Sequence, residues 1–100
     1  MNITVLTPER ALFEGAIVSV KVPGVAGEFQ ILQNHAPIVS ALEAGKVTIV
    51  TADGVHRFFD EESGDLVEAQ EAGKRLEYQV EGGFVEVLGN EVSLLIAGTV

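Results

Sequence analysis

The chain has 100 residues, of which 47% are hydrophobic, and it contains no cysteine. This length suits a single domain with a modest core, and the missing thiols exclude a disulfide framework and a thiolate metal site. The formal net charge of −9 argues against a nucleic-acid surface, which needs clustered Lys and Arg, and against direct adhesion to anionic lipid.

The sequence contains no apolar run near the roughly 20 residues that span a bilayer, and its N-terminus lacks the pattern of a signal peptide. We therefore expect a cytoplasmic protein without direct membrane insertion. Any link to a membrane would run through a partner.

Apolar and polar residues alternate along several short segments that are rich in β-branched side chains. Val18, Val20 and Val22 are predicted to share one face of a strand. The alternation recurs over residues 47–51, 76–80 and 92–96. The pattern predicts an all-β fold, namely one antiparallel β-sandwich of about eight to ten strands that occupies residues 1–100.

Turn-forming residues separate these segments at intervals of roughly ten residues, which favours a sandwich over βαβ units. Pro23-Gly24 predicts a turn with glycine at a positive φ, and Asp53-Gly54 predicts a tight hairpin between two strands. Gly82-Gly83 predicts a bulge or sharp bend, and Gly89-Asn90 predicts the hairpin before the last strand.

Residues 60–75 are the exception to the strand pattern. From Asp60 to Glu71 they carry six acids and no base. Asp65 and Glu68 match a helix capping box, but two turns of helix are marginal without packing. We expect an acidic loop or a short helix inserted in the sandwich, and the loop is favoured.

The sequence offers no residue set that predicts catalysis. Its two histidines, His35 and His56, belong to neither an H-x-x-x-H nor an H-E-x-x-H pattern. No nucleophile elbow and no G-x-x-x-x-G-K-[ST] phosphate loop occurs. A solvated surface explains the 15 acidic residues better than an acid–base pair does. We predict no enzyme activity, no cofactor and no metal.

Several strands carry apolar residues on both faces. Phe84 and Leu88 lie on the face opposite Val85 and Val87. Outward positions of a sandwich are mostly polar, so an apolar cluster there predicts a protein-binding patch, unless bends in the strands place some of these residues inside. The other second-face residues of this kind are Leu95, Ile17 and Val50.

Three segments together resemble the epsilon subunit of F-type ATP synthases, in its N-terminal β-sandwich domain. The most specific is residues 23–40, which place a turn, a short apolar strand and a polar loop ending in His35-Ala36-Pro37 in succession. Residues 7–15 resemble the family's N-terminal segment, and residues 82–92 resemble its late hairpin. The matches leave out residues 60–75, where the family usually has a tighter connection.

The resemblance implies a non-catalytic rotor subunit of the central stalk, with ATP chemistry on other subunits. A sheet face would bind the gamma subunit, and Phe84 and Leu88 are the candidate contacts. The subunit would tie proton flow to rotation at the cytoplasmic face of an energy-transducing membrane, as a peripheral protein.

The resemblance also implies that the loop end contacts the c-subunit ring. Glu28 and His35 match the motif positions for this contact. Gln30 and Gln33 depart from the family's usual Gly and Pro, but their side chains can hydrogen-bond a polar partner. For His35, a local hydrogen bond that fixes the loop is an equal alternative.

Two further expectations concern what the chain lacks and what else it resembles. The family commonly continues into a C-terminal helical pair, which can regulate hydrolysis and in some members binds ATP. The sequence stops at Val100, so we expect neither nucleotide binding nor autoinhibition by helix insertion.

The rival interpretation is a stand-alone carrier or ligand-binding β domain of lipoyl-like type, for which Lys46 is the candidate lysine.

Overall fold

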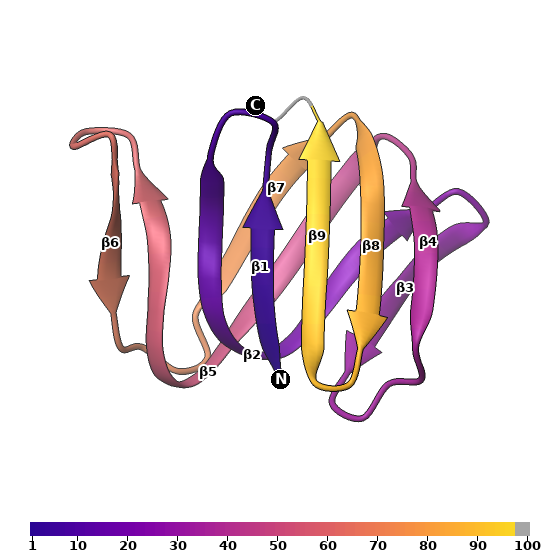
Figure 1. Ribbon diagram of the computed structural model, residues 1–100, viewed down its shortest axis with the longest axis horizontal. Coiled ribbons are helices and arrows are strands. Elements are labelled where there is room, and N and C mark those ends of the chain that lie inside the picture. Colours follow the sequence, from indigo (N-terminus) through magenta and orange to yellow (C-terminus); the bar gives the residue numbers. More distant parts are fainter. Residues whose placement is uncertain (98–100) are drawn as a thin grey trace.

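The computed structural model describes residues 1–97. Within that range it contains nine β-strands and no helix (Figure 1). The predicted all-β fold is confirmed. The strands are β1 (Asn2–Leu6), β2 (Ala11–Gly24), β3 (Gly27–Leu32), β4 (Ile38–Leu42), β5 (Gly45–Asp60), β6 (Asp65–Ala69), β7 (Arg75–Val80), β8 (Gly82–Leu88) and β9 (Glu91–Ala97).

The strands form one sheet that folds into two layers, because β2 and β5 are long and bend. The near layer in Figure 1 contains β4, β8, β9 and β1, followed by the first part of β2, the last part of β5, and β6. The far layer contains β3, the later part of β2, the first part of β5, and β7. Side chains from both layers meet in a β-sandwich core.

The first and last strands of the fold lie side by side. Ile3 of β1 is opposite Gly15 of β2 in an antiparallel pair and opposite Val92 of β9 in a parallel pair. β1 is thus enclosed by strands on both edges, as Figure 1 shows.

The core follows the predicted alternation at most strands. Val47, Ile49 and Thr51 are fully buried, and Val92, Leu94 and Ile96 are each at most 2% exposed. The prediction is wrong at the start of the valine series, where Val18 is 53% exposed and Ile17 is buried. The register between β2 and β5 shifts on both sides of Ile17, so the two faces exchange at this point.

Two predicted turns are wrong in their position. Asp53-Gly54 does not reverse the chain, because β5 continues through it and pairs with β2 on both sides. Gly54, with φ of 119°, lies in a bulge that bends β5 from one layer into the other. Pro23-Gly24 ends β2, and the turn comes next at Val25-Ala26, with the positive φ at Gly27.

The acidic segment is also different from the prediction, because its central part forms a strand. Residues 65–69 form β6, which pairs antiparallel with residues 56–60 of β5 around a turn at 61–64. Leu66 and Val67 lie on opposite sides of this strand. Pairing with β5 and side-chain packing stabilise the strand, whereas a short helix without packing is marginal.

The remaining turn predictions are confirmed. At Gly82-Gly83 the chain leaves β7 in the far layer and enters β8 in the near layer, with Gly83 at φ 145°. Gly89-Asn90 forms the two-residue hairpin between β8 and β9. Gly89 has a φ of 63°, which suits the first central position of such a turn.

Candidate functional site: the outer face of the near layer

The near layer presents an apolar surface that points away from the core, and we call it the outer face. Phe84 and Leu88 of β8 are 58% and 66% exposed, while Val85 and Val87, which lie between them in the sequence, are buried. The adjacent strands add Val39 of β4 and Leu95 of β9, at 72% and 51% exposed. Large apolar side chains therefore gather on three neighbouring strands.

Cross-strand pairing brings these residues next to one another. Phe84 is opposite Ala41 on one side and Leu95 on the other, and Leu95 is in turn opposite Leu6 of β1. A hollow of about 380 Å³ between Leu6, Phe84, Leu95 and the Thr7-Pro8 corner follows this apolar line. A smaller hollow of about 250 Å³ lies beside Pro37, Val39 and Leu88.

Sequence reasoning found Phe84, Leu88 and Leu95 for this face but missed Val39 and Leu6. Both are apolar residues in apolar strands, so alternation alone does not distinguish them from core residues. Their outward direction depends on the pairing of Val39 with Glu86 and of Leu6 with Leu95. Of the other residues predicted for the second faces, Ile17 is buried and Val50 is half-buried.

The loop between β3 and β4 holds two of the four residues predicted to contact the c-subunit ring. Gln33 is exposed and His35 is half-buried. The His35 Nδ1 lies 2.7 Å from the Ala36 carbonyl oxygen, and the His35 backbone N–H donates to the Leu32 carbonyl at 3.2 Å. The local hydrogen bond considered for His35 is therefore present, and Asn34 supports the turn with a φ of 66°.

Glu28 and Gln30 are placed elsewhere, because both lie on β3 and not in the loop. Their side chains are exposed on the same side of the strand. Glu28 forms an ion pair with Lys21, with 3.7 Å between Oε1 and Nζ. At ~3.3 Å per residue, Glu28 is about 17 Å from Gln33. Glu28 and Gln30 thus form a polar strip on β3, and Leu32, which is 51% exposed on the same side, separates this strip from Gln33 and His35 in the loop. The four residues do not converge at one point.

His56 and Lys46, two of the side chains that the sequence analysis considered for chemistry, lie in local contacts. No group of His, Cys, Asp and Glu within residues 1–97 is placed to hold a metal ion. His56 is buried against Phe13. Lys46, the candidate for a carrier lysine, is the second residue of β5 and forms an ion pair with Glu77 at 3.3 Å. It is not displayed at a hairpin tip, so the geometry does not support the carrier interpretation.

Among residues 1–97, no helix is long and apolar enough to cross a membrane.

Comparison with known proteins assigns the domain. Residues 1–64 match the model of the family described as ATP synthase, Delta/Epsilon chain, beta-sandwich domain, and the chain belongs to that family. Its relatives include the ATP synthase epsilon chain of Chlorobium limicola, which is 37% identical over 94 residues, or 94% of this chain and 85% of the relative. The epsilon chain of Leptospira borgpetersenii serovar Hardjo-bovis is 36% identical over 95% of this chain and 59% of the relative. The resemblance predicted from the sequence is confirmed.

Two solved structures share the fold. One is a chain of the Euglena gracilis mitochondrial ATP synthase, from a structure of OSCP, F1 and the c-ring in rotational state 1, with a TM-score of 0.69, 19% identity, and coverage of 98% of this chain and 51% of that chain. The other is from the central stalk and c-ring of the Tetrahymena thermophila mitochondrial ATP synthase, with a TM-score of 0.64, 17% identity, and coverage of 100% and 65%.

Proposed function

We propose that this chain is a non-catalytic central-stalk subunit of an F-type ATP synthase, which couples rotation of the gamma subunit to the c-subunit ring. The observation that carries the proposal is the apolar outer face on a domain of the epsilon family. The subunit would be peripheral, at the cytoplasmic face of the membrane, and ATP chemistry would take place on other subunits.

The outer face suits a protein partner better than solvent. Single exposed apolar residues are normal on protein surfaces, but contiguous patches mark binding sites. Phe84, Leu88, Val39 and Leu95 are each more than half exposed and lie on adjacent strands. Aromatic residues such as phenylalanine are enriched in protein interfaces, and a few residues near the centre of an interface carry most of its binding energy. We assign this face to the gamma subunit.

The loop end suits a polar partner. Gln33 and His35 lie in a segment that Pro37 stiffens by fixing its own φ and restricting Ala36. The strip of Glu28 and Gln30 lies on β3, which leads into this loop. We assign the strip and the loop to the polar surface of the c-subunit ring.

The two assigned surfaces are joined by a close-packed core. Among residues 1–97, seventeen hydrophobic residues are buried at 9% exposure or less and form one core cluster, and such interiors deform little under load. A displacement imposed on the outer face would therefore reach the loop end with little loss, as mechanical coupling requires.

The test replaces Phe84 and Leu88 together by serine and measures binding of the purified gamma subunit of the same complex. We expect binding at least ten-fold weaker, with the urea unfolding midpoint of the isolated domain nearly unchanged, because both side chains are exposed. The control is the double variant Val18→Ser/Val25→Ser, which removes two exposed valines from β2 and the β2–β3 hairpin. Equal binding by both double variants would overturn the assignment of this face.

A further inference from the structure

The β5–β6 hairpin extends the near layer sideways and is not used by the function proposed above. Its first strand pairs with the start of β2, with Phe58 opposite Phe13 and Arg57 opposite Glu14. Phe13 is itself opposite the core residue Val5. Since alternate residues face opposite sides, Phe58 points inward, and Arg57 and Phe59 point to the outer face.

The apolar line on the outer face continues onto this hairpin. On one side of β2 it consists of Phe84, Leu95 and Leu6, each opposite the next. On the other side, Phe59 of β5 is opposite Leu66 of β6. Leu12 of β2 lies between the two parts, because the register that pairs Phe13 with Phe58 sets it beside Phe59. Leu12 is only 9% exposed, so the apolar side chains that a partner can reach lie on either side of it. We call this line, from Phe84 to Leu66, the apolar row.

The apolar row is long. It runs across β8, β9, β1, β2, β5 and β6, as the near layer of Figure 1 shows. At ~4.8 Å between neighbouring strands, the distance from the first strand to the last is about 24 Å.

A second row beside it is charged. Glu86 leads through Ser93 and Thr4 to Glu14, which is opposite Arg57, and Arg57 is opposite Glu68. The Arg57 Nε lies 3.7 Å from the Glu68 Oε1. Among residues 1–97, Glu14 and Glu86 have no ion pair within 4.0 Å, so this charged row is net negative.

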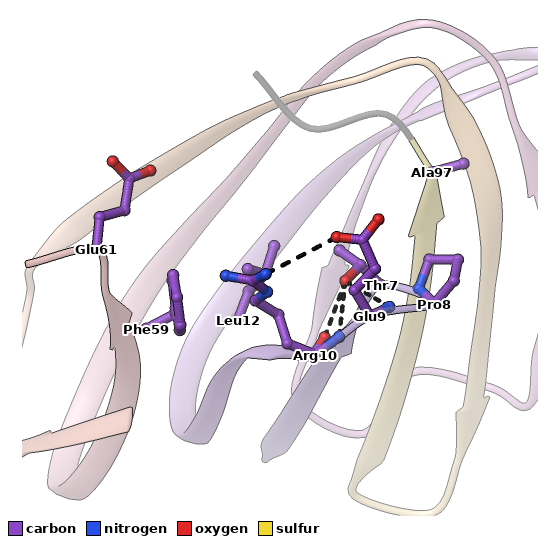
Figure 2. A pocket seen from close by; sticks show the side chains of 8 residues that line it. All are labelled: Thr7, Pro8, Glu9, Arg10, Leu12, Phe59, Glu61 and Ala97. Atoms are coloured by element: carbon purple, nitrogen blue, oxygen red, sulfur yellow. Dashed lines mark hydrogen bonds and ion pairs between the residues drawn. The ribbon is translucent and has the colours of Figure 1, made fainter. Parts of the chain in front are cut away.

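Two hollows meet along the apolar row. The hollow beside Phe84 and a second one of about 440 Å³ share the Thr7-Pro8 corner and Ala97. Figure 2 shows Leu12, Phe59 and Arg10 around the second hollow. The Arg10 guanidinium lies 4.6 Å from the centre of the Phe59 ring. The Arg10 side chain is half exposed, and its Nη2 lies 3.8 Å from the Glu9 Oε2, while Phe59 is half-buried.

We propose that the gamma subunit binds across the full width of the outer face and that the β5–β6 hairpin is part of its footprint. The bound surface would be an apolar strip that follows the row from Phe84 to Leu66, flanked by Lys or Arg side chains opposite the charged row. This proposal rests on the function proposed above. A second copy of the chain fits poorly, because two net-negative rows on chains of charge −9 would face each other.

The first test measures binding of the purified gamma subunit to three variants of the hairpin. Leu66→Ser and Phe59→Ser are expected to weaken binding three- to thirty-fold. Glu62→Ser, in the exposed turn of the same hairpin, is the matched control and is expected to leave the dissociation constant unchanged. If Phe84→Ser weakens binding and both hairpin variants do not, the wide footprint is wrong while the proposed function stands. If the unchanged chain does not bind gamma at all, the proposed function itself fails.

The second test needs no variant, so it is decisive even where Phe59→Ser unfolds the hairpin. Backbone hydrogen exchange of the unchanged chain is compared with and without gamma. We expect slower exchange in β8, β9, β5 and β6 of the complex. Slower exchange in β8 and β9 together with unchanged exchange over residues 55–69 would overturn the wide footprint. Sedimentation that reveals a dimer lost on Leu66→Ser would overturn it in favour of self-association.

Discussion

The imidazole of His56 stacks on the phenyl ring of Phe13, with 5.3 Å between the ring centres and 22° between their planes. Both side chains are buried, and within residues 1–97 neither nitrogen of His56 has a hydrogen-bond partner. The backbones are also close here, since an added Cβ at Gly15 would overlap the Cβ of His56. This contact packs the β5 strand of the β5–β6 hairpin against β2, beside the strand pairing that joins the two.

The replacement His56→Phe is expected to stabilise the domain. A buried polar group without a partner costs about 1–3 kcal/mol, and phenylalanine keeps an aromatic ring against Phe13. We expect the free energy of unfolding in urea to rise by about 1 kcal/mol. His56→Ala is the comparison, because it removes packing as well, and it should lower stability. A loss of stability in His56→Phe as large as in His56→Ala would mean that the imidazole nitrogens contribute favourably.

Gly83 should tolerate no side chain. It has a φ of 145°, and a Cβ there would overlap the Leu95 carbonyl oxygen on β9. Gly83→Ala should therefore cost at least about 2 kcal/mol, measured by thermal or urea unfolding. Gly89→Ala is the control, since Gly89 also has a positive φ, of 63°, but no atom within 4 Å of an added Cβ. It should cost only about 1 kcal/mol, and equal losses in the two variants would contradict the crowding at Gly83.

Stability should fall at alkaline pH because of Tyr78. Burial raises the pKa of Tyr78 from 10.0 to about 12, so the folded state keeps the phenol proton when the unfolded state has lost it. The unfolded state then binds fewer protons, and stability decreases as the pH rises from about 10 to 12. Below pH 10 this contribution is fully present. Urea midpoints between pH 9 and 11.5 measure the slope, and Tyr78→Phe should flatten it; an equally steep slope in that variant would assign the effect to other groups.

Substitutions in the loop between β3 and β4 should weaken the contact with one partner only, the c-subunit ring. Gln33→Ala/His35→Ala removes two polar side chains from the surface assigned to the c-subunit ring and leaves the outer face intact. In the reassembled complex, we expect ATP hydrolysis to drive several-fold less proton pumping, while binding of gamma is unchanged. Gln79→Ala, at an exposed position of β7, is the control. Normal pumping by the double variant would remove the loop from the c-ring contact.

Much of the fold was predictable because it depends on local patterns. The buried triplets at Val47–Thr51 and Val92–Ile96 follow from period-two alternation, and the Gly89-Asn90 hairpin follows from turn chemistry. Phe84 and Leu88 were recognised as second-face residues for the same reason, and the epsilon-type motifs were recognisable from residues 23–40.

The wrong predictions share a cause: the register between strands that are distant in the sequence cannot be predicted from local sequence. Asp53-Gly54 has the composition of a hairpin, yet both sides of it pair with β2, so the glycine bends β5 and does not reverse it. Ile17 and Val18 exchange faces because the same register shifts. Residues 65–69 have helix-capping chemistry, but the end of β5 offers them a paired edge. The outward direction of Leu6 and Val39 depends on pairing in the same way.

The parallel pair of β1 and β9 has a consequence for synthesis. β1 is made first, and its outer edge stays open until β9 has left the ribosome, nearly the full chain later. Such contacts between the ends of a chain slow folding and leave open edges exposed to aggregation. Nascent chains that stall before Glu91 would therefore expose an edge of β1 that β9 covers in the folded domain.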